Sequence, residues 1–388
     1  MPEQEVGIPI EPVGLQRTQI KSPYFESALT IARKEVPGVE KEVSKLLENI
    51  DRQGIENISS YKSQVFEGVQ IPYSKVDVNR LASESFDSLA GDYSDKREIH
   101  IIFCGLALPP AGHPFTAWDM VYDRAIGLLP KVVNPLSEGE KPPLVEVYSF
   151  GSPNGLGGKV TREWVEAIAK EGFAKYGEVY AELVKSLVPK DRENTRVIFE
   201  GMSMGSSTAQ ATATELGQEY RIQLLLDNPV GLDGGRVKNR FKVPVGFVRE
   251  GRYFMREHPQ RADLEGKSEK EFLTGMQSYL ETNGLVDDKR QSFMKKLAVL
   301  VDVIKISGTN KFGEVRSFIR RATEDMTSFS EDFQKDASDK VNQGKNPVFA
   351  KGGALMFAIE GHHFIDRMRV KKWERVINFC KKIRPVSS

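Results

Sequence analysis

Cysteine is nearly absent from this sequence, and so is any long apolar run. The only cysteines are Cys104 and Cys380, which excludes a framework of disulfides and is typical of a reducing compartment. No stretch of about 18 apolar residues occurs, so we expect no transmembrane helix. Residues 1–30 contain no apolar segment of signal-peptide length. These absences predict a cytoplasmic protein.

An excess of one sign of charge is missing too. Lys and Arg number 55 and Asp and Glu number 54, a net charge of +1. This balance gives no electrostatic reason to expect nucleic acid or an anionic membrane as a partner. No His, Cys and Asp residues have the spacing of a zinc site, and the glycine-rich residues 151–158 lack the Gly-Lys-Ser/Thr ending of a P-loop. We therefore predict no metal and no cofactor; the oligomeric state is not indicated.

Short apolar strands alternate with helical segments from residue 59 onward. Runs such as HIIF, LVEVYSF, VIFE and IQLLL are each followed within two residues by glycine or aspartate, and segments of helical periodicity separate them. This alternation predicts an α/β fold: a mainly parallel central sheet covered by helices on both faces. In such sheets ligands bind at the carboxyl ends of the strands, so candidate functional residues are sought there.

The flanking segments suggest how the chain is organised. Residues 1–58 are predicted to form an arm and a helical extension, residues 59–232 and 298–388 the α/β core, and residues 233–297 an inserted helical cap. Within the second part of the core, we expect residues 297–310 to be a strand and residues 316–341 to be mostly helical. The expected helix of the extension has an apolar face made by Val39, Val43, Leu46, Leu47 and Ile50.

The clearest motif is Gly201-Met202-Ser203-Met204-Gly205. An apolar strand precedes it and a helix rich in small residues follows. Glycine on both sides of Ser203 lets the backbone turn sharply and keeps neighbouring chain clear, so the serine hydroxyl is presented at a strand tip above a helix N-terminus. This context predicts that Ser203 is a nucleophile.

A serine nucleophile needs a base and an acid. His362 and His363 follow the apolar run ALMFAIEG, and we predict that His362 is the base, with His363 as second choice. For the acid we favour Asp227, which ends the run IQLLLD. Glu314 is second and Asp233 third, because no aspartate directly follows the predicted strand 297–310.

The developing oxyanion of an acyl-transfer reaction also needs hydrogen-bond donors. We expect one from the backbone N–H of Met204, directly after the nucleophile. The second is expected from the N–H of Leu106, in the proline- and glycine-rich loop after the strand HIIF. His100 lies inside that strand, where a structural role is more typical than a catalytic one.

Taken in order, these segments resemble the α/β-hydrolase superfamily, in particular its serine esterases, lipases and lactonases. The resemblance covers roughly residues 60–385 and rests on VFEGVQIPYSKV, HIIFCGLAL, VYSFGSPNGLG, GMSMG and EGHHF. Two residues depart from the family pattern: Ser149 replaces an aspartate in the glycine loop, and Lys311 stands where the acid after the seventh strand is common. Some members take an acid after the sixth strand, and Asp227 looks like that arrangement.

The resemblance implies a serine hydrolase that cleaves an ester, thioester or lactone of a small molecule, with an apolar acyl or lactone group. Two alternatives remain open. An acyltransferase would use the same triad with an alcohol in place of water, and a ligand-binding member of the fold would lack catalysis.

Overall fold

The computed structural model describes the central part of the chain and two later strands. Besides isolated positions such as Thr161 and Trp164, the described residues are 40–86, 93–103, 118–133, 141–151, 173–217, 219–228, 316–322 and 354–359. The predicted cap, residues 233–297, and the predicted strand 297–310 lie outside them.

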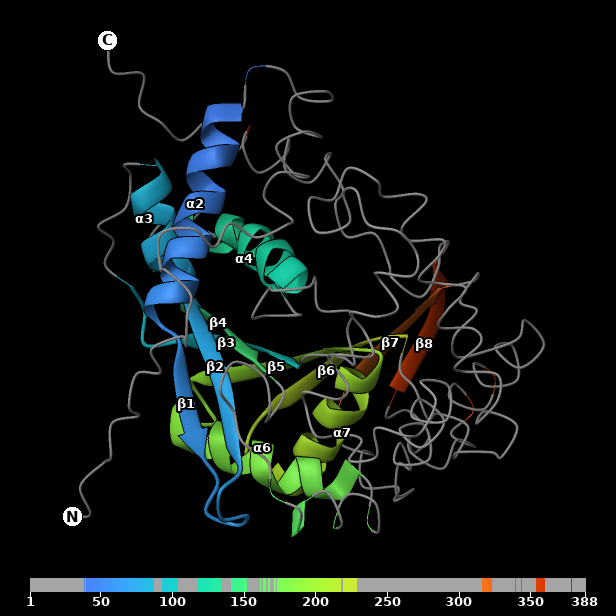
Figure 1. The fold of residues 1–388 in the computed structure, drawn as a ribbon. Coiled ribbons are helices and arrows are strands. Elements are labelled where there is room, and N and C mark those ends of the chain that lie inside the picture. Colours follow the sequence, from blue (N-terminus) through green and yellow to red (C-terminus); the bar gives the residue numbers. More distant parts are fainter. Residues whose placement is uncertain are drawn as a thin grey trace, which may run out of the picture.

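Eight strands form one sheet in the order β1-β2-β4-β3-β5-β6-β7-β8 (Figure 1). Strand β2 is antiparallel to both of its neighbours, β1 and β4. Every other neighbouring pair in this order is parallel. The mainly parallel sheet is therefore confirmed. The strands are β1 Ser59–Lys62, β2 Gln70–Asp77, β3 Arg97–Phe103, β4 Leu144–Phe150, β5 Thr195–Met202, β6 Ile222–Asp227, β7 Arg316–Ala322 and β8 Ala354–Ile359.

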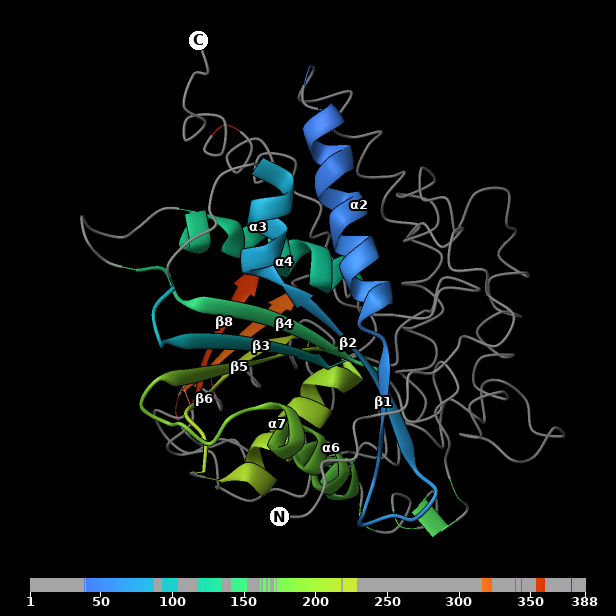
Figure 2. The same cartoon turned by 90° about the vertical axis from the view of Figure 1, so that its left-hand side faces the viewer.

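Helices cover both faces of this sheet, as the alternation predicts (Figures 1 and 2). On one face lie α2 (Glu40–Glu56), α3 (Val78–Phe86) and α4 (Trp118–Val133), and on the other lie α6 (Phe173–Leu187) and α7 (Met204–Leu216). Each face has its own buried apolar cluster. Burial of this kind contributes about 25 cal/mol per Å² of apolar surface, so the two clusters are the main stabilising term of the sheet.

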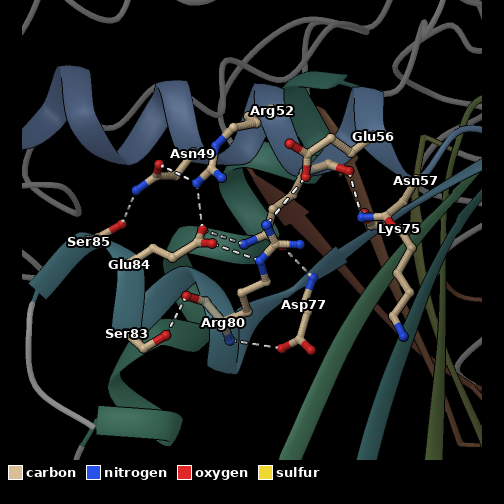
Figure 3. Close-up of polar contacts among 11 residues, drawn as sticks. Asn49, Arg52, Glu56, Asn57, Lys75, Asp77, Arg80, Ser83, Glu84 and Ser85 are labelled. Atoms are coloured by element: carbon tan, nitrogen blue, oxygen red, sulfur yellow. Dashed lines mark hydrogen bonds and ion pairs between the residues drawn. The ribbon is translucent and has the colours of Figure 1, made fainter. Parts of the chain in front are cut away.

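Helix α2 is part of the first of these layers. Four residues of its predicted apolar face are buried against α3 and α4: Val43, Leu46, Leu47 and Ile50. Charged side chains close the seam between α2 and α3 at the surface, where Glu84 lies 2.8 Å from Arg52 and 2.7 Å from Arg80 (Figure 3). Exposed pairs of this kind contribute about 0–1 kcal/mol each, so apolar packing rather than charge holds α2 in place.

The prediction for residues 316–341 is wrong at the start of this segment, and the difference bears on the site. The segment is predicted to be mostly helical, but its residues 316–322 form β7, between β6 and β8. The segment RSFIRRA has only two large apolar residues, Phe318 and Ile319, so its local pattern does not identify a strand. Its backbone pairs on both sides, Asp227 with Arg320 and Ala322 with Ile359. This pairing overrides the local preference of the segment.

Candidate active site

Ser203 occupies a strained turn between β5 and α7. Its φ is 56° and its ψ is −122°, just before α7 begins at Met204. Residues other than glycine rarely adopt this conformation, which costs about 1–3 kcal/mol and persists only where the surroundings enforce it. Strain of this size concentrates at functional sites, so the backbone alone marks Ser203 as a candidate functional residue.

Gly201, which precedes the turn, has no room for a side chain. A Cβ atom added to Gly201 would lie 2.5 Å from the carbonyl oxygen of Gly205 and 2.5 Å from the backbone nitrogen of Ser206. Both contacts are with backbone, which cannot give way as a flexible side chain can. The predicted role of Gly201, keeping neighbouring chain clear, is confirmed.

Hydrogen bonds fasten this turn to the end of the next strand. The backbone N–H of Ser203 donates to the carbonyl of Asp227 over 2.9 Å. The hydroxyl of Ser206, which is fully buried, lies 2.8 Å from the carbonyl of Gly201 and 3.3 Å from that of Asp227. The carboxyl ends of β5 and β6 therefore form one connected unit around Ser203.

The N-terminus of α7 gives the turn at Ser203 a positive electrostatic environment. The first N–H groups of a helix have no acceptor within the helix and carry the positive end of its dipole. Met204 is the first residue of α7, so its backbone is placed as the prediction of an oxyanion donor requires. The arrangement can stabilise negative charge that develops on a group attached to Ser203.

The structure brings some predicted site residues together, and others lie outside its described part. Ser203 and Asp227 meet at neighbouring strand ends, and both are buried, with 8% and 2% exposed. Strand β3 ends at Phe103, in register with Gly201, shortly before Leu106 in the chain; β8 ends at Ile359, shortly before the histidines. Outside the described residues lie Leu106, Asp233, Glu314, His362 and His363.

The corrected position of β7 changes the set of candidate acids. Glu314 is predicted as an acid because it follows the expected strand 297–310, which lies outside the described residues. In the described sheet, Glu314 precedes β7 in the chain, since β7 begins at Arg316. The residues that follow β7 in the chain are Thr323, Glu324 and Asp325. The sequence analysis does not select this acidic pair because it predicts residues 316–341 to be mostly helical; the available signal was the acidic pair that follows RSFIRRA and Thr323.

Among the residues that the structure describes, no three His, Cys, Asp or Glu side chains are grouped so that they could hold a metal ion. No described helix is long and apolar enough to cross a membrane.

The sequence matches no protein-family model and no curated protein. Solved structures of similar shape include an esterase from Exiguobacterium antarcticum, at 10% identity and a TM-score of 0.44, covering 84% of this chain and 99% of that one. A peroxisomal α/β-hydrolase from Saccharomyces cerevisiae is 12% identical with a TM-score of 0.43, covering 82% of this chain and 84% of that one. An enol-lactonase from Burkholderia xenovorans is 12% identical with a TM-score of 0.41, covering 84% and 97%.

The fold assignment rests on this structure's own sheet. It is the mainly parallel sheet, covered by helices on both faces, that the resemblance implies. The strained serine after β5 lies at the corresponding strand-to-helix turn. The chain has the α/β-hydrolase fold.

Proposed function

We propose that the chain is a serine hydrolase that cleaves a small-molecule ester, thioester or lactone with an apolar acyl or lactone group. The observation that carries this proposal is the backbone of Ser203, strained at φ 56° and ψ −122° directly before the N-terminus of α7. A packing role gives no reason to hold a serine in this conformation, whereas presentation of a nucleophile does.

In the proposed reaction, the hydroxyl oxygen of Ser203 attacks the substrate carbonyl while His362 accepts its proton. The N–H groups of Met204 and Leu106 donate to the resulting oxyanion. Collapse of the tetrahedral intermediate expels the alcohol or thiol, which takes the proton from His362, and leaves an acyl group on Ser203. Water then attacks the acyl group with the same base, releasing the acid and restoring the serine.

The acid that orients the histidine is proposed from two strand ends. Asp227 ends β6, and Glu324 and Asp325 follow β7. The proposed base follows β8, whose neighbour in the sheet is β7 and not β6. Because neighbouring strands lie about 4.8 Å apart, the end of β7 is one strand from that of β8 and the end of β6 is two. This geometry favours the pair after β7 and keeps Asp227 as the second candidate.

Covalent labelling tests the proposal most directly. Wild-type protein should react with a fluorophosphonate probe, and mass spectrometry of the digested adduct should find the label on Ser203. Ser203→Ala should abolish labelling and lower ester turnover on the order of 10⁴-fold or more. Ser186→Ala, which removes a hydroxyl of α6 that bonds to the carbonyl of Leu183, is the matched control and should label normally.

The outcomes separate the alternatives. Folded wild-type protein that does not label would overturn the proposal and favour a ligand-binding role. Labelling with transfer of the acyl group to an added alcohol, in preference to water, would favour an acyltransferase. A series of esters of increasing acyl length tests the apolar preference, which the proposal attributes to residues 233–297 as a cap.

A further inference from the structure

A cluster of charged side chains lies between the sheet and α4, on the face opposite α7; its members on the sheet are buried and its members on α4 are partly exposed. It consists of Glu98 and His100 of β3, Glu200 of β5, and Arg124 and Lys131 of α4. We call it the α4 ion cluster. His100 and Glu200 are 3% and 2% exposed, and Glu98 is 9% exposed, so none of the three is a surface charge.

The cluster consists of two ion pairs, Arg124 with Glu200 and Lys131 with Glu98, and His100 lies between the two carboxylates. Near the carboxyl end of β5, an Nη of Arg124 donates a hydrogen bond of 2.7 Å to Oε2 of Glu200, and the Nε of Arg124 lies 2.5 Å from Oε1 as an ion pair without hydrogen-bond geometry. Further back, Lys131 lies 2.5 Å from Glu98. The two cations are seven residues apart, about two helical turns, which places both on the same side of α4.

The imidazole of His100 contacts the carboxylates of both ion pairs. Its Nδ1 lies 2.9 Å from Oε1 of Glu200 and its Nε2 lies 2.8 Å from Oε1 of Glu98. An imidazole that carries both of its protons donates to both carboxylates. Every charged member of the cluster thus has at least one partner of opposite charge, as buried charges require.

The three elements joined here are those from which the candidate site extends. Strand β3 ends at Phe103, α4 begins at Trp118, and the chain between them contains Leu106. Strand β5 continues from Glu200 through Gly201 and Met202 to Ser203. The α4 ion cluster therefore links the strand before Leu106, the helix after Leu106 and the strand that precedes Ser203.

We propose that Glu200, held by Arg124 and His100, is a positioning residue that fixes the turn at Ser203 relative to β3 and α4. The catalytic consequence rests on the proposed function, because it requires Ser203 to react. A displacement of about 1 Å at a reacting group can lower a rate about 100-fold. Glu200 lies three residues before Ser203, so its contacts with Arg124 and His100 can prevent such a displacement of the nucleophile.

Glu200→Gln tests the proposal, because the amide keeps the size of the side chain and removes its charge. The matched control is Glu146→Gln, which removes a carboxylate paired with Lys75 on the same sheet, between β4 and β2. Two measurements are made well below the melting temperature of each variant. One is the rate of fluorophosphonate reaction per folded molecule, with kcat and KM for an ester; the other is hydrogen exchange of peptides that cover residues 198–208 and 118–133.

For Glu200→Gln we expect the reaction rate and kcat to fall about tenfold or more, with KM within about twofold, and faster exchange around Ser203 and in α4. Glu146→Gln should stay within about twofold of wild type on both measurements. Arg124→Lys keeps the positive charge but loses the planar guanidinium that faces both carboxylate oxygens of Glu200. It should show a smaller change in the same direction, and it carries the test if Glu200→Gln does not fold.

Wild-type exchange and reaction rates in folded Glu200→Gln would overturn the proposal, as would an equal loss in Glu146→Gln. Lower stability with an unchanged rate per folded molecule would also overturn it, because the cluster would then be structural only. If the wild-type protein itself does not react with the probe, the proposed function fails. Hydrogen exchange around Ser203, which needs no activity, then decides the positioning role alone.

Discussion

The backbone N–H of Ser203 donates a hydrogen bond of 2.9 Å to the backbone carbonyl of Asp227. The contact joins the carboxyl ends of β5 and β6 and involves no side-chain atom of residue 227. Substitution of the Asp227 carboxylate therefore leaves this bond in place. A mutation at residue 227 can then report on the carboxylate itself rather than on the turn that holds Ser203.

We predict that the acid of the triad follows β7. Asp325→Asn or Glu324→Gln should lower kcat on the order of 10⁴-fold, because an amide in place of the orienting carboxylate favours the wrong imidazole tautomer. Asp227→Asn should be milder, with folding intact. Steady-state kinetics on one ester, with circular dichroism to confirm folding, measures all three variants. A larger loss in Asp227→Asn than in either variant after β7 would return the assignment to Asp227.

A second prediction concerns the adjacent histidines after β8. We expect the consecutive side chains of His362 and His363 to point in different directions, as they would in an extended chain, so that only one of them reaches Ser203. We expect His362→Ala to lose nearly all turnover and His363→Ala to keep a substantial part. Rates of fluorophosphonate reaction should follow the same order. The opposite order would make His363 the base, and full activity in both variants would refute a triad that uses either.

A third prediction compares two glycines, Gly201, where a side chain would clash with backbone atoms, and Gly217, where only the positive φ disfavours a side chain. Gly201→Ala should destabilise the protein strongly and lower labelling of Ser203, because the added Cβ meets backbone atoms at 2.5 Å. Gly217→Ala, at the other end of α7, meets nothing within 4 Å and is opposed only by its φ of +54°. Its loss in free energy of unfolding should be about 1–3 kcal/mol, the cost of this backbone conformation alone. Urea unfolding compares them, and equal losses would contradict the steric argument.

The features predictable from sequence are those encoded locally. The turn at Ser203 is flanked by glycines, with an apolar strand before it and small residues after it, so a short window contains the whole signal. Strands β3 and β5 are buried on both faces over most of their length, and β6 is buried on one face and partly buried on the other, so each contains a short apolar run.

What escaped prediction depends on partners far along the chain. Strand β7 has charged residues at both ends and is fixed by pairing with β6 and β8. The acidic pair after it was missed for the same reason. In the α4 ion cluster, Glu98 and His100 occupy an apolar strand as isolated polar residues, and a partner, Glu200, lies 100 residues from His100 in the sequence. No local pattern indicates such a contact.

The last prediction is the dependence of stability on pH. Burial alone would raise the pKa of Glu200, but attraction to Arg124 and hydrogen bonds from His100 and Arg124 outweigh it and lower the pKa from 4.5 to about 2. Glu98 is similar: burial opposes ionisation, and its bonds to His100 and Lys131 lower its pKa to about 2. Between about pH 2 and 4.5 the unfolded chain therefore binds more protons at these residues than the folded chain.

The sign follows from that difference. The stabilisation from each carboxylate is complete above about pH 4.5 and is lost as the pH falls toward 2, with a slope of up to about 1.4 kcal/mol per pH unit for each group. Wild-type stability should fall steeply with acid in this window. Glu200→Gln, which cannot titrate, should be less stable at neutral pH, and its slope should be shallower by about the contribution of one group. Urea unfolding at a series of pH values from 7 to 2.5 measures both curves. Parallel curves would show that Glu200 does not titrate with the lowered pKa that its contacts with Arg124 and His100 require.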